Sequence, residues 1–180
     1  MKNLAYLFIL MLAAQYTFDV AALRAEPEIS IWPSSTSVST GDTFELNILI
    51  SDAIVDLMGY SLTVWFNDMV LGVQNVTEGD LLLYSGHQTF FEWTNQGSVT
   101  NSISVNGAIL GNTVSGPGWL CTLTFEAIQT GTSGIHFIES DLRDNANNSI
   151  GHARNSGMVY VDWTIMVKTG TWGAIKSLYR

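Results

Sequence analysis

The chain has 180 residues, of which 47% are hydrophobic and 13% are charged, so it is long enough to bury a sizeable core as one domain. Sixteen acidic residues against seven basic ones give a net charge of −9, which excludes nucleic acid and anionic membrane surfaces as natural partners. A single cysteine, Cys121, excludes an internal disulfide and a cysteine-rich zinc site. It lies on the same side of its segment as Leu123 and Phe125, which predicts a core position rather than a reactive thiol.

The first 25 residues have the layout of a secretory signal peptide. Lys2 precedes an apolar run over residues 4–18, and small residues follow at Ala21, Ala22 and Ala25. The run is short for a membrane span, and an uncleaved N-terminal anchor is the alternative. We therefore expect residues 1–25 to be removed, the protein to be secreted or displayed at the cell surface, and no membrane association beyond the signal peptide.

Residues 26–167 read as strand after strand, separated by turns rich in Gly, Asn, Asp and Ser. Such turn residues supply positive φ angles and local hydrogen bonds. The segments are rich in Val, Ile, Thr and aromatic residues, which predicts an all-β, antiparallel sandwich of about nine strands. The expected strands are 28–32, 43–51, 58–66, 69–77, 89–95, 98–110, 119–128, 134–140 and 157–168.

The segment 58–66 alternates most clearly. Tyr60, Leu62, Val64 and Phe66 fall on one side and are expected to face the core. Gly59, Ser61, Thr63 and Trp65 fall on the other side, which leaves a tryptophan on an otherwise polar face. Trp65 is either a binding anchor, or it is covered by residues 89–95 or by the C-terminal tail.

Residues 168–180 form a C-terminal tail. Trp172, Ile175 and Tyr179 are spaced as on one face of a short helix, with Lys176 and Arg180 near its end. The tail is either a helix packed on the sandwich, a frayed terminus or a recognition segment. No helical periodicity precedes it.

The order of motifs along residues 28–165 resembles that of the cohesin domain, the dockerin-binding module of cellulosome scaffolds. The motifs that carry the resemblance are Gly41–Phe44, Phe66–Leu71, Gly79–Leu82, Gly118–Phe125, Gly131–Ser133, the Asp/Asn-rich segment 141–150, and Gly157–Val161. The resemblance implies a jelly-roll sandwich of nine strands. It also implies a dockerin-bearing secreted protein as partner, in an extracellular assembly linked to polysaccharide breakdown.

The chain departs from the cohesin pattern in two places. Gly59 and Ser61 stand where many cohesins present Asn and Asp to the dockerin, and an aromatic-Asp-Pro turn has become Phe66-Asn67-Asp68. The predicted partner-binding residues lie on the outer sheet face. They are Ser61, Thr63 and Trp65 on one strand, with Leu120, Thr122 and Thr124 as neighbours from another.

Two other classes of function stay open. A carbohydrate-binding module would stack sugars on Trp65, Trp93 or Tyr84, so polysaccharide is a possible ligand, and a structural cell-surface domain would bind no soluble ligand. We expect no catalytic residues and no cofactor, because no nucleophile elbow, P-loop or Gly-x-Gly-x-x-Gly motif occurs.

We also expect no metal site. The histidines lack ligand spacing, and the segment 141–152 lacks the alternating oxygen ligands of an EF-hand. Hydrogen bonds from Asp and Asn side chains are the expected way in which this turn is held.

Overall fold

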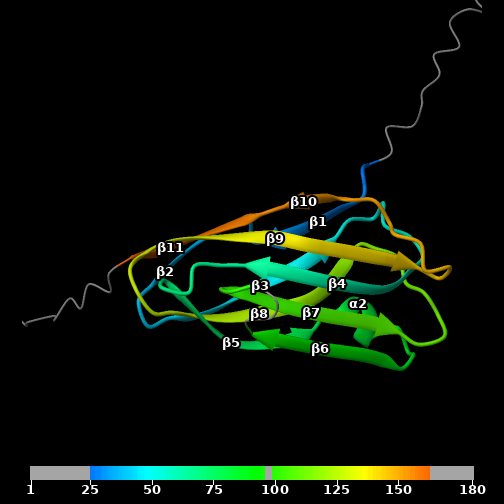
Figure 1. The fold of residues 1–180 in the computed structure, drawn as a ribbon, viewed down its shortest axis with the longest axis horizontal. Helices are drawn as coiled ribbons and strands as arrows, with labels where there is room; N and C mark the ends of the chain where they lie inside the picture. Colours follow the sequence, from blue (N-terminus) through cyan, green and yellow to red (C-terminus); the bar gives the residue numbers. More distant parts are fainter. Residues whose placement is uncertain (1–24, 96–98, 163–180) are drawn as a thin grey trace, which may run out of the picture.

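The computed structural model describes residues 25–95 and 99–162, which form two β-sheets packed face to face (Figure 1). One sheet has five strands in the order β10-β1-β3-β8-β5, and the other has six in the order β2-β11-β9-β4-β7-β6. The strands are β1 (Glu28–Trp32), β2 (Ser35–Ser39), β3 (Thr43–Ile50), β4 (Leu57–Trp65), β5 (Leu71–Glu78), β6 (Thr89–Asn95), β7 (Ser102–Ile109), β8 (Gly118–Ala127), β9 (Gly131–Asp144), β10 (Ala153–Asn155) and β11 (Gly157–Asp162). The predicted all-β sandwich is confirmed.

The strand inventory corrects the sequence prediction at the sheet edges. The segment 35–39, expected as a turn, forms β2 at the edge of the six-stranded sheet, and 153–155 forms the short edge strand β10. Both pair in parallel, β2 with β11 and β10 with β1, so the sheets are mixed rather than purely antiparallel. Short polar strands show no clear alternation of apolar and polar residues, so the sequence pattern does not reveal them. Short polar strands of this kind are common at the edges of sheets.

The core lies between the sheets and consists of the inward side chains of both. The Phe125 ring stacks on Phe44 at 5.9 Å and meets Phe66 edge-on at 5.3 Å. Tyr60, Leu62, Val64 and Phe66 are all buried, as their alternation predicted. Each fully buried aliphatic or aromatic side chain of this kind contributes about 1.5–3 kcal/mol relative to exposure.

Cys121 belongs to this core. It is fully buried between the sheets, and burial raises the pKa of its thiol well above its ordinary value. A thiol kept protonated and covered is unreactive, so Cys121 is a packing residue, as its place beside Leu123 and Phe125 predicted.

One helix within the described residues was not predicted. The single turn α2 (Asp80–Leu83) buries Leu82 against the five-stranded sheet, and the Asp80 carboxylate accepts a hydrogen bond from the Trp119 backbone N–H at 3.1 Å. Gly79 precedes it because a Cβ there would overlap the backbone of Trp119 and Leu120. A four-residue helix is too short to show a 3.6-residue period.

The predicted signal peptide, except Ala25, and the predicted tail 168–180 lie outside the described residues. Within residues 25–95 and 99–162, no helix combines the length and apolar character needed to cross a bilayer.

Tyr60 joins the two sheets from the centre of the six-stranded one. Its hydroxyl donates a hydrogen bond of 2.9 Å to the Leu120 carbonyl on β8, and its ring lies over Gly107 of β7. A Cβ at Gly107 would come within 2.5 Å of the ring carbons, so this position accepts no side chain without moving the tyrosine.

We predict that Gly107→Ala destabilises the protein by about 1–3 kcal/mol, because the new methyl group overpacks the buried Tyr60 ring. Urea unfolding followed by tryptophan fluorescence measures the loss. Gly72→Ala is the control, since its Cβ would meet only Ile128, at 4.0 Å, and its free energy of unfolding should change by less than about 0.5 kcal/mol. Equal stability of the two variants would contradict the packing described here.

Candidate binding surface

The outer face of the six-stranded sheet presents side chains from β9, β4, β7 and β6, which lie side by side in Figure 1. Four outward residues of β4 each sit between a β9 and a β7 neighbour. The rows are Arg143–Gly59–Ala108, Asp141–Ser61–Asn106, Glu139–Thr63–Ser104 and His136–Trp65–Ser102. On β6, Phe90 extends the first row and Glu92 the second.

Trp65 is half-buried on this face. Its ring stacks on His136 of β9 with ring centres 5.9 Å apart and planes 23° apart. The His136 ring in turn lies against Gly134, where a Cβ would collide with it. Residues 89–95 do not cover Trp65, because β7 separates β6 from β4. Among the described residues, the tryptophan is therefore held in place by a neighbour and keeps part of its surface open. The C-terminal tail, the other predicted cover, lies outside them.

The other two predicted residues of β4 differ in how much surface they offer. Ser61 is exposed, whereas Thr63 is only 5% exposed although it points outward. Of the three, Ser61 and Trp65 are accessible to a partner, and Thr63 serves mainly to fill the face between them.

The three residues predicted from β8 do not belong to this surface. β8 lies in the five-stranded sheet, so Thr122 and Thr124 point outward from the opposite side of the sandwich. Thr122 donates a hydrogen bond of 2.6 Å to the Asn47 side chain there. Leu120 is fully buried at a register shift, where β3 pairs with Cys121 and then with Trp119. The bulge breaks the alternation that had placed Leu120 outside.

The aromatic row expected for sugar stacking does not form. Trp93 pairs with buried Val105 and packs against the core, so Trp65 and Trp93 project from opposite faces of the sheet. Tyr84 is 81% exposed but lies just beyond α2, away from the strands that carry Trp65.

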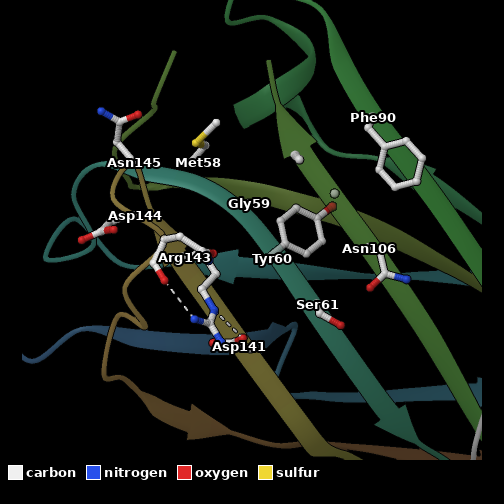
Figure 2. A pocket seen from close by; sticks show the side chains of 13 residues that line it. Met58, Gly59, Tyr60, Ser61, Phe90, Asn106, Asp141, Arg143, Asp144 and Asn145 are labelled. Carbon is white, nitrogen blue, oxygen red and sulfur yellow. Dashed lines mark hydrogen bonds and ion pairs between the residues drawn. The ribbon is translucent and has the colours of Figure 1, made fainter. Parts of the chain in front are cut away.

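A hollow of about 520 Å³ opens on the outer face beside Ser61 (Figure 2). Its floor is made of small residues, Gly59, Ser61 and Ala108, together with Asn106. Phe90 lines one side with apolar surface, and the chain from Asp141 to Asn147 forms the opposite side, with Met58 of β4 near Asn145. The sequence signal for this hollow was the pair Gly59 and Ser61, small residues at outward positions.

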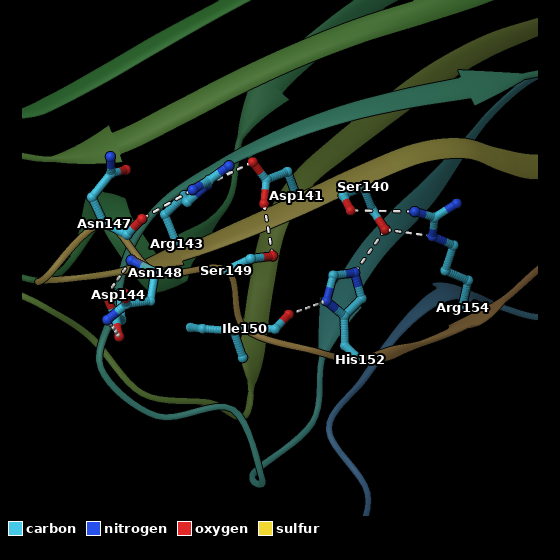
Figure 3. Close-up of polar contacts among 10 residues, drawn as sticks. All are labelled: Ser140, Asp141, Arg143, Asp144, Asn147, Asn148, Ser149, Ile150, His152 and Arg154. Atoms are coloured by element: carbon cyan, nitrogen blue, oxygen red, sulfur yellow. Dashed lines mark hydrogen bonds and ion pairs between the residues drawn. The ribbon is translucent and has the colours of Figure 1, made fainter.

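The turn after β9 is held by Asp144 (Figure 3). Its Oδ1 accepts hydrogen bonds from the Ala146 and Asn148 backbone N–H groups at 2.9 and 2.8 Å, and its Oδ2 accepts one from the Asn148 side chain at 3.0 Å. The Asn148 side chain, followed by the backbone N–H groups, lowers the pKa of Asp144. The expected Asx-type turn is confirmed.

Arg143 is tied to this turn on the rim of the hollow. Its Nε donates to Asp141 at 2.6 Å, and its Nη1 donates to the Asn147 carbonyl at 2.9 Å. Desolvation raises the pKa of Asp141, but hydrogen bonds from Arg143 and Ser149 outweigh it and the net shift is downward. The only cation on this side of the hollow is thus already paired among the described residues.

A second polar cluster joins β9 to β10 and so links the two sheets (Figure 3). Because His152 Nδ1 lies 2.7 Å from the Ile150 carbonyl, Nδ1 carries the proton and Nε2 accepts from the Ser140 hydroxyl at 2.7 Å. Arg154 donates to the same hydroxyl oxygen at 2.7 Å. Neither Ser140 nor His152 lines the hollow, so we assign the cluster a structural role.

The face carries negative charge that is not neutralised. Glu92 and Glu139 are exposed, and their carboxylates make no hydrogen bond or ion pair with any residue in 25–95 or 99–162. Among those residues there is also no group of three or more His, Cys, Asp and Glu side chains placed to hold a metal ion.

Comparison of the structure with solved structures identifies the fold. A non-cellulosomal cohesin from the archaeon Archaeoglobus fulgidus matches with a TM-score of 0.65 at 20% identity, covering 77% of this chain and 92% of the archaeal one. The OlpA cohesin of Clostridium thermocellum, solved in complex with a dockerin, matches with a TM-score of 0.63 at 16% identity, covering 76% and 99%. The third ScaB cohesin of R. flavefaciens, in complex with a group 1 dockerin, matches with a TM-score of 0.58 at 12% identity, covering 77% and 97%.

No protein-family profile and no curated protein sequence matches the chain. The likeness is therefore one of structure, and it shows that this chain has the cohesin fold.

We predict that Asp144→Ala disorders the turn after β9, because two backbone N–H groups lose their acceptor, whereas Asp144→Asn retains Oδ1 and is milder. In the folded protein the pKa of Asp144 lies below its ordinary value of 3.8, so the carboxylate stabilises the turn above that pH. This contribution is lost as the pH falls through the lowered pKa.

Amide NMR of Ala146 and Asn148 checks both parts of this prediction. In the wild-type chain, the chemical shifts of these two amides should change with pH at a midpoint below 3.8, as Asp144 titrates. This pH-dependent change should be absent in both variants. Midpoints at or above 3.8 would contradict the turn described here.

Proposed function

We propose that the protein is a secreted, non-catalytic binding module whose partner is a dockerin-type protein. The observation that carries the proposal is the fold: cohesins solved in complex with dockerins match about three quarters of this chain and nearly the whole of their own. The outer face of β9-β4-β7-β6 is the proposed contact surface.

The surface itself supports a protein partner. It combines a partly exposed, immobilised tryptophan, an exposed phenylalanine and a hollow with a rim of polar side chains. Interfaces of stable complexes share this arrangement of aromatic anchors within a polar surround. Because Trp65 is already stacked on His136, little side-chain entropy is lost when a partner binds.

The proposed setting is an extracellular assembly, which rests on the predicted signal peptide. A link to polysaccharide breakdown follows from the cellulosome resemblance and is the less direct part of the proposal. The matching archaeal cohesin is described as non-cellulosomal, so the fold does not by itself require a cellulosome.

The test is capture of partners from the secreted proteins of the source organism. The immobilised full chain is incubated with calcium and, in parallel, with EDTA, because dockerins resemble paired EF-hand loops and fold on binding calcium. Captured proteins that carry such paired loops, and are lost in EDTA, support the proposal. Retention on polysaccharide gels without calcium-dependent capture would instead indicate a carbohydrate-binding module.

We predict that Trp65→Ala weakens binding of the captured dockerin by about 30-fold or more, since truncated aromatic anchors cost about 2 kcal/mol or more. Calorimetric titration measures the change. Thr124→Ala on the opposite sheet is the control and should bind as the wild-type chain does. Loss of folded circular dichroism in Trp65→Ala, or equal affinity of both variants, would remove Trp65 from the interface.

A further inference from the structure

We infer that the hollow beside Gly59 receives a bulky apolar side chain, Leu, Phe or Trp, from a helix of the dockerin-type partner, with basic residues flanking it. This inference rests on the proposed function and specifies the partner's recognition sequence. Four features support it. The floor of the hollow consists of small residues, one wall is apolar, the arginine on the rim is already paired, and two carboxylates on this face are unpaired among the described residues.

Gly59 leaves the floor empty, and its φ angle does not by itself require glycine. It lies within β4 and does not have a positive φ angle, unlike Gly41, Gly86, Gly111 and Gly131. A register shift against β9 lies next to it, but a side chain would not strain this backbone conformation. Glycine inside a strand often marks close approach of another backbone, which here is that of β7, and it also leaves the space above position 59 open.

Any side chain at position 59 would change the floor of the hollow, because its Cβ would press against β7. A Cβ at Gly59 would lie 3.2 Å from the Gly107 carbonyl oxygen and 3.4 Å from the Ala108 Cβ. With glycine here, the volume above the floor is left for the partner to fill.

The walls favour an apolar occupant. Phe90 is 49% exposed on β6 and, with Met58 and Ala108, gives the hollow apolar surface. An aromatic side chain placed against it would bury about 150–250 Å², enough for an interface anchor. On the other side Arg143 is already paired with Asp141 and the Asn147 carbonyl, so it offers no unpaired cation to an acidic ligand (Figure 2).

The charges around the hollow set what flanks that anchor. Glu92 lies across Asn106 from Ser61, and Glu139 lies one row further along β9. Both carboxylates are exposed and unpaired among the described residues. Lys or Arg beside the apolar side chain would pair with them, and an acidic segment would be repelled.

The test selects partners without assuming their sequence. The probe is a phage library built on the dockerin bound in the OlpA complex, with the exposed helix positions randomised, selected on the full chain in calcium. We expect the enriched clones to carry Leu, Phe or Trp at one position, with Lys or Arg near it. Enrichment of polar or acidic residues instead would overturn the inference.

Two variants of this protein then test whether the apolar side chain of the selected clones binds in the hollow. Gly59→Asn fills the hollow, and Phe90→Ala removes its wall, and each should weaken the selected clones about tenfold or more. Thr124→Asn, the same kind of enlargement on the opposite sheet, should leave affinity unchanged. Thermal unfolding shows whether the variants fold, and Ala108→Gln serves as a second filling variant if Gly59→Asn does not.

The outcomes separate the two proposals. If clones bind in calcium but bind Phe90→Ala and the filled variants as tightly as the wild-type chain, the inference fails and the proposed function stands. If no clone binds in calcium, the proposed function fails and the inference fails with it. If cellobiose, added alone, shifts the amide NMR signals of Gly59 and Ala108, the hollow binds sugar and the inference is overturned.

Discussion

The hydrogen bond from Tyr60 to the Leu120 carbonyl ties the two sheets together at the centre of the molecule. Two local features make it possible: Gly107 has no side chain beneath the ring, and β8 bulges at Leu120. The Gly79 N–H donates to the same carbonyl at 2.9 Å. Burial raises the pKa of Tyr60 well above its ordinary value, so the hydroxyl keeps the proton that it donates. Because β4 is anchored inward in this way, its outward residues are fixed relative to the β9 and β7 neighbours that complete the surface.

The side chains on the two faces of β4 have different roles. Tyr60, Leu62 and Val64 fill the core, so they are constrained in size and polarity, whereas Gly59 and Ser61 face outward and carry none of that packing. The hollow is a consequence of this division. Small outward residues leave space on the surface without removing anything from the core, so the fold does not oppose their presence.

The sequence predicted well what depends on local pattern. The inward side of β4, the buried Cys121 and the Asp144 turn all follow from periodicity or turn chemistry, and the structure confirms them. It could not predict which strands become neighbours. Alternation says that Thr124 points outward but not from which sheet, and a single bulge moved Leu120 from the expected surface into the core. The hollow escaped prediction for the same reason, since apart from Met58 its walls come from β6, the end of β9 and the turn that follows, far from Gly59 in sequence.

The same reasoning explains how a chain only 12–20% identical to these solved cohesins keeps their fold. Apolar side chains of suitable size on the inner faces specify the sandwich, and many sequences meet that requirement. Outward positions do not have to meet this requirement of size and apolarity, so substitutions there can change a binding surface at little cost in stability. The sequence resemblance places Gly59 and Ser61, both outward residues, where many cohesins carry a polar pair. Under the proposed function, this difference bears on which partner is recognised rather than on whether the chain folds.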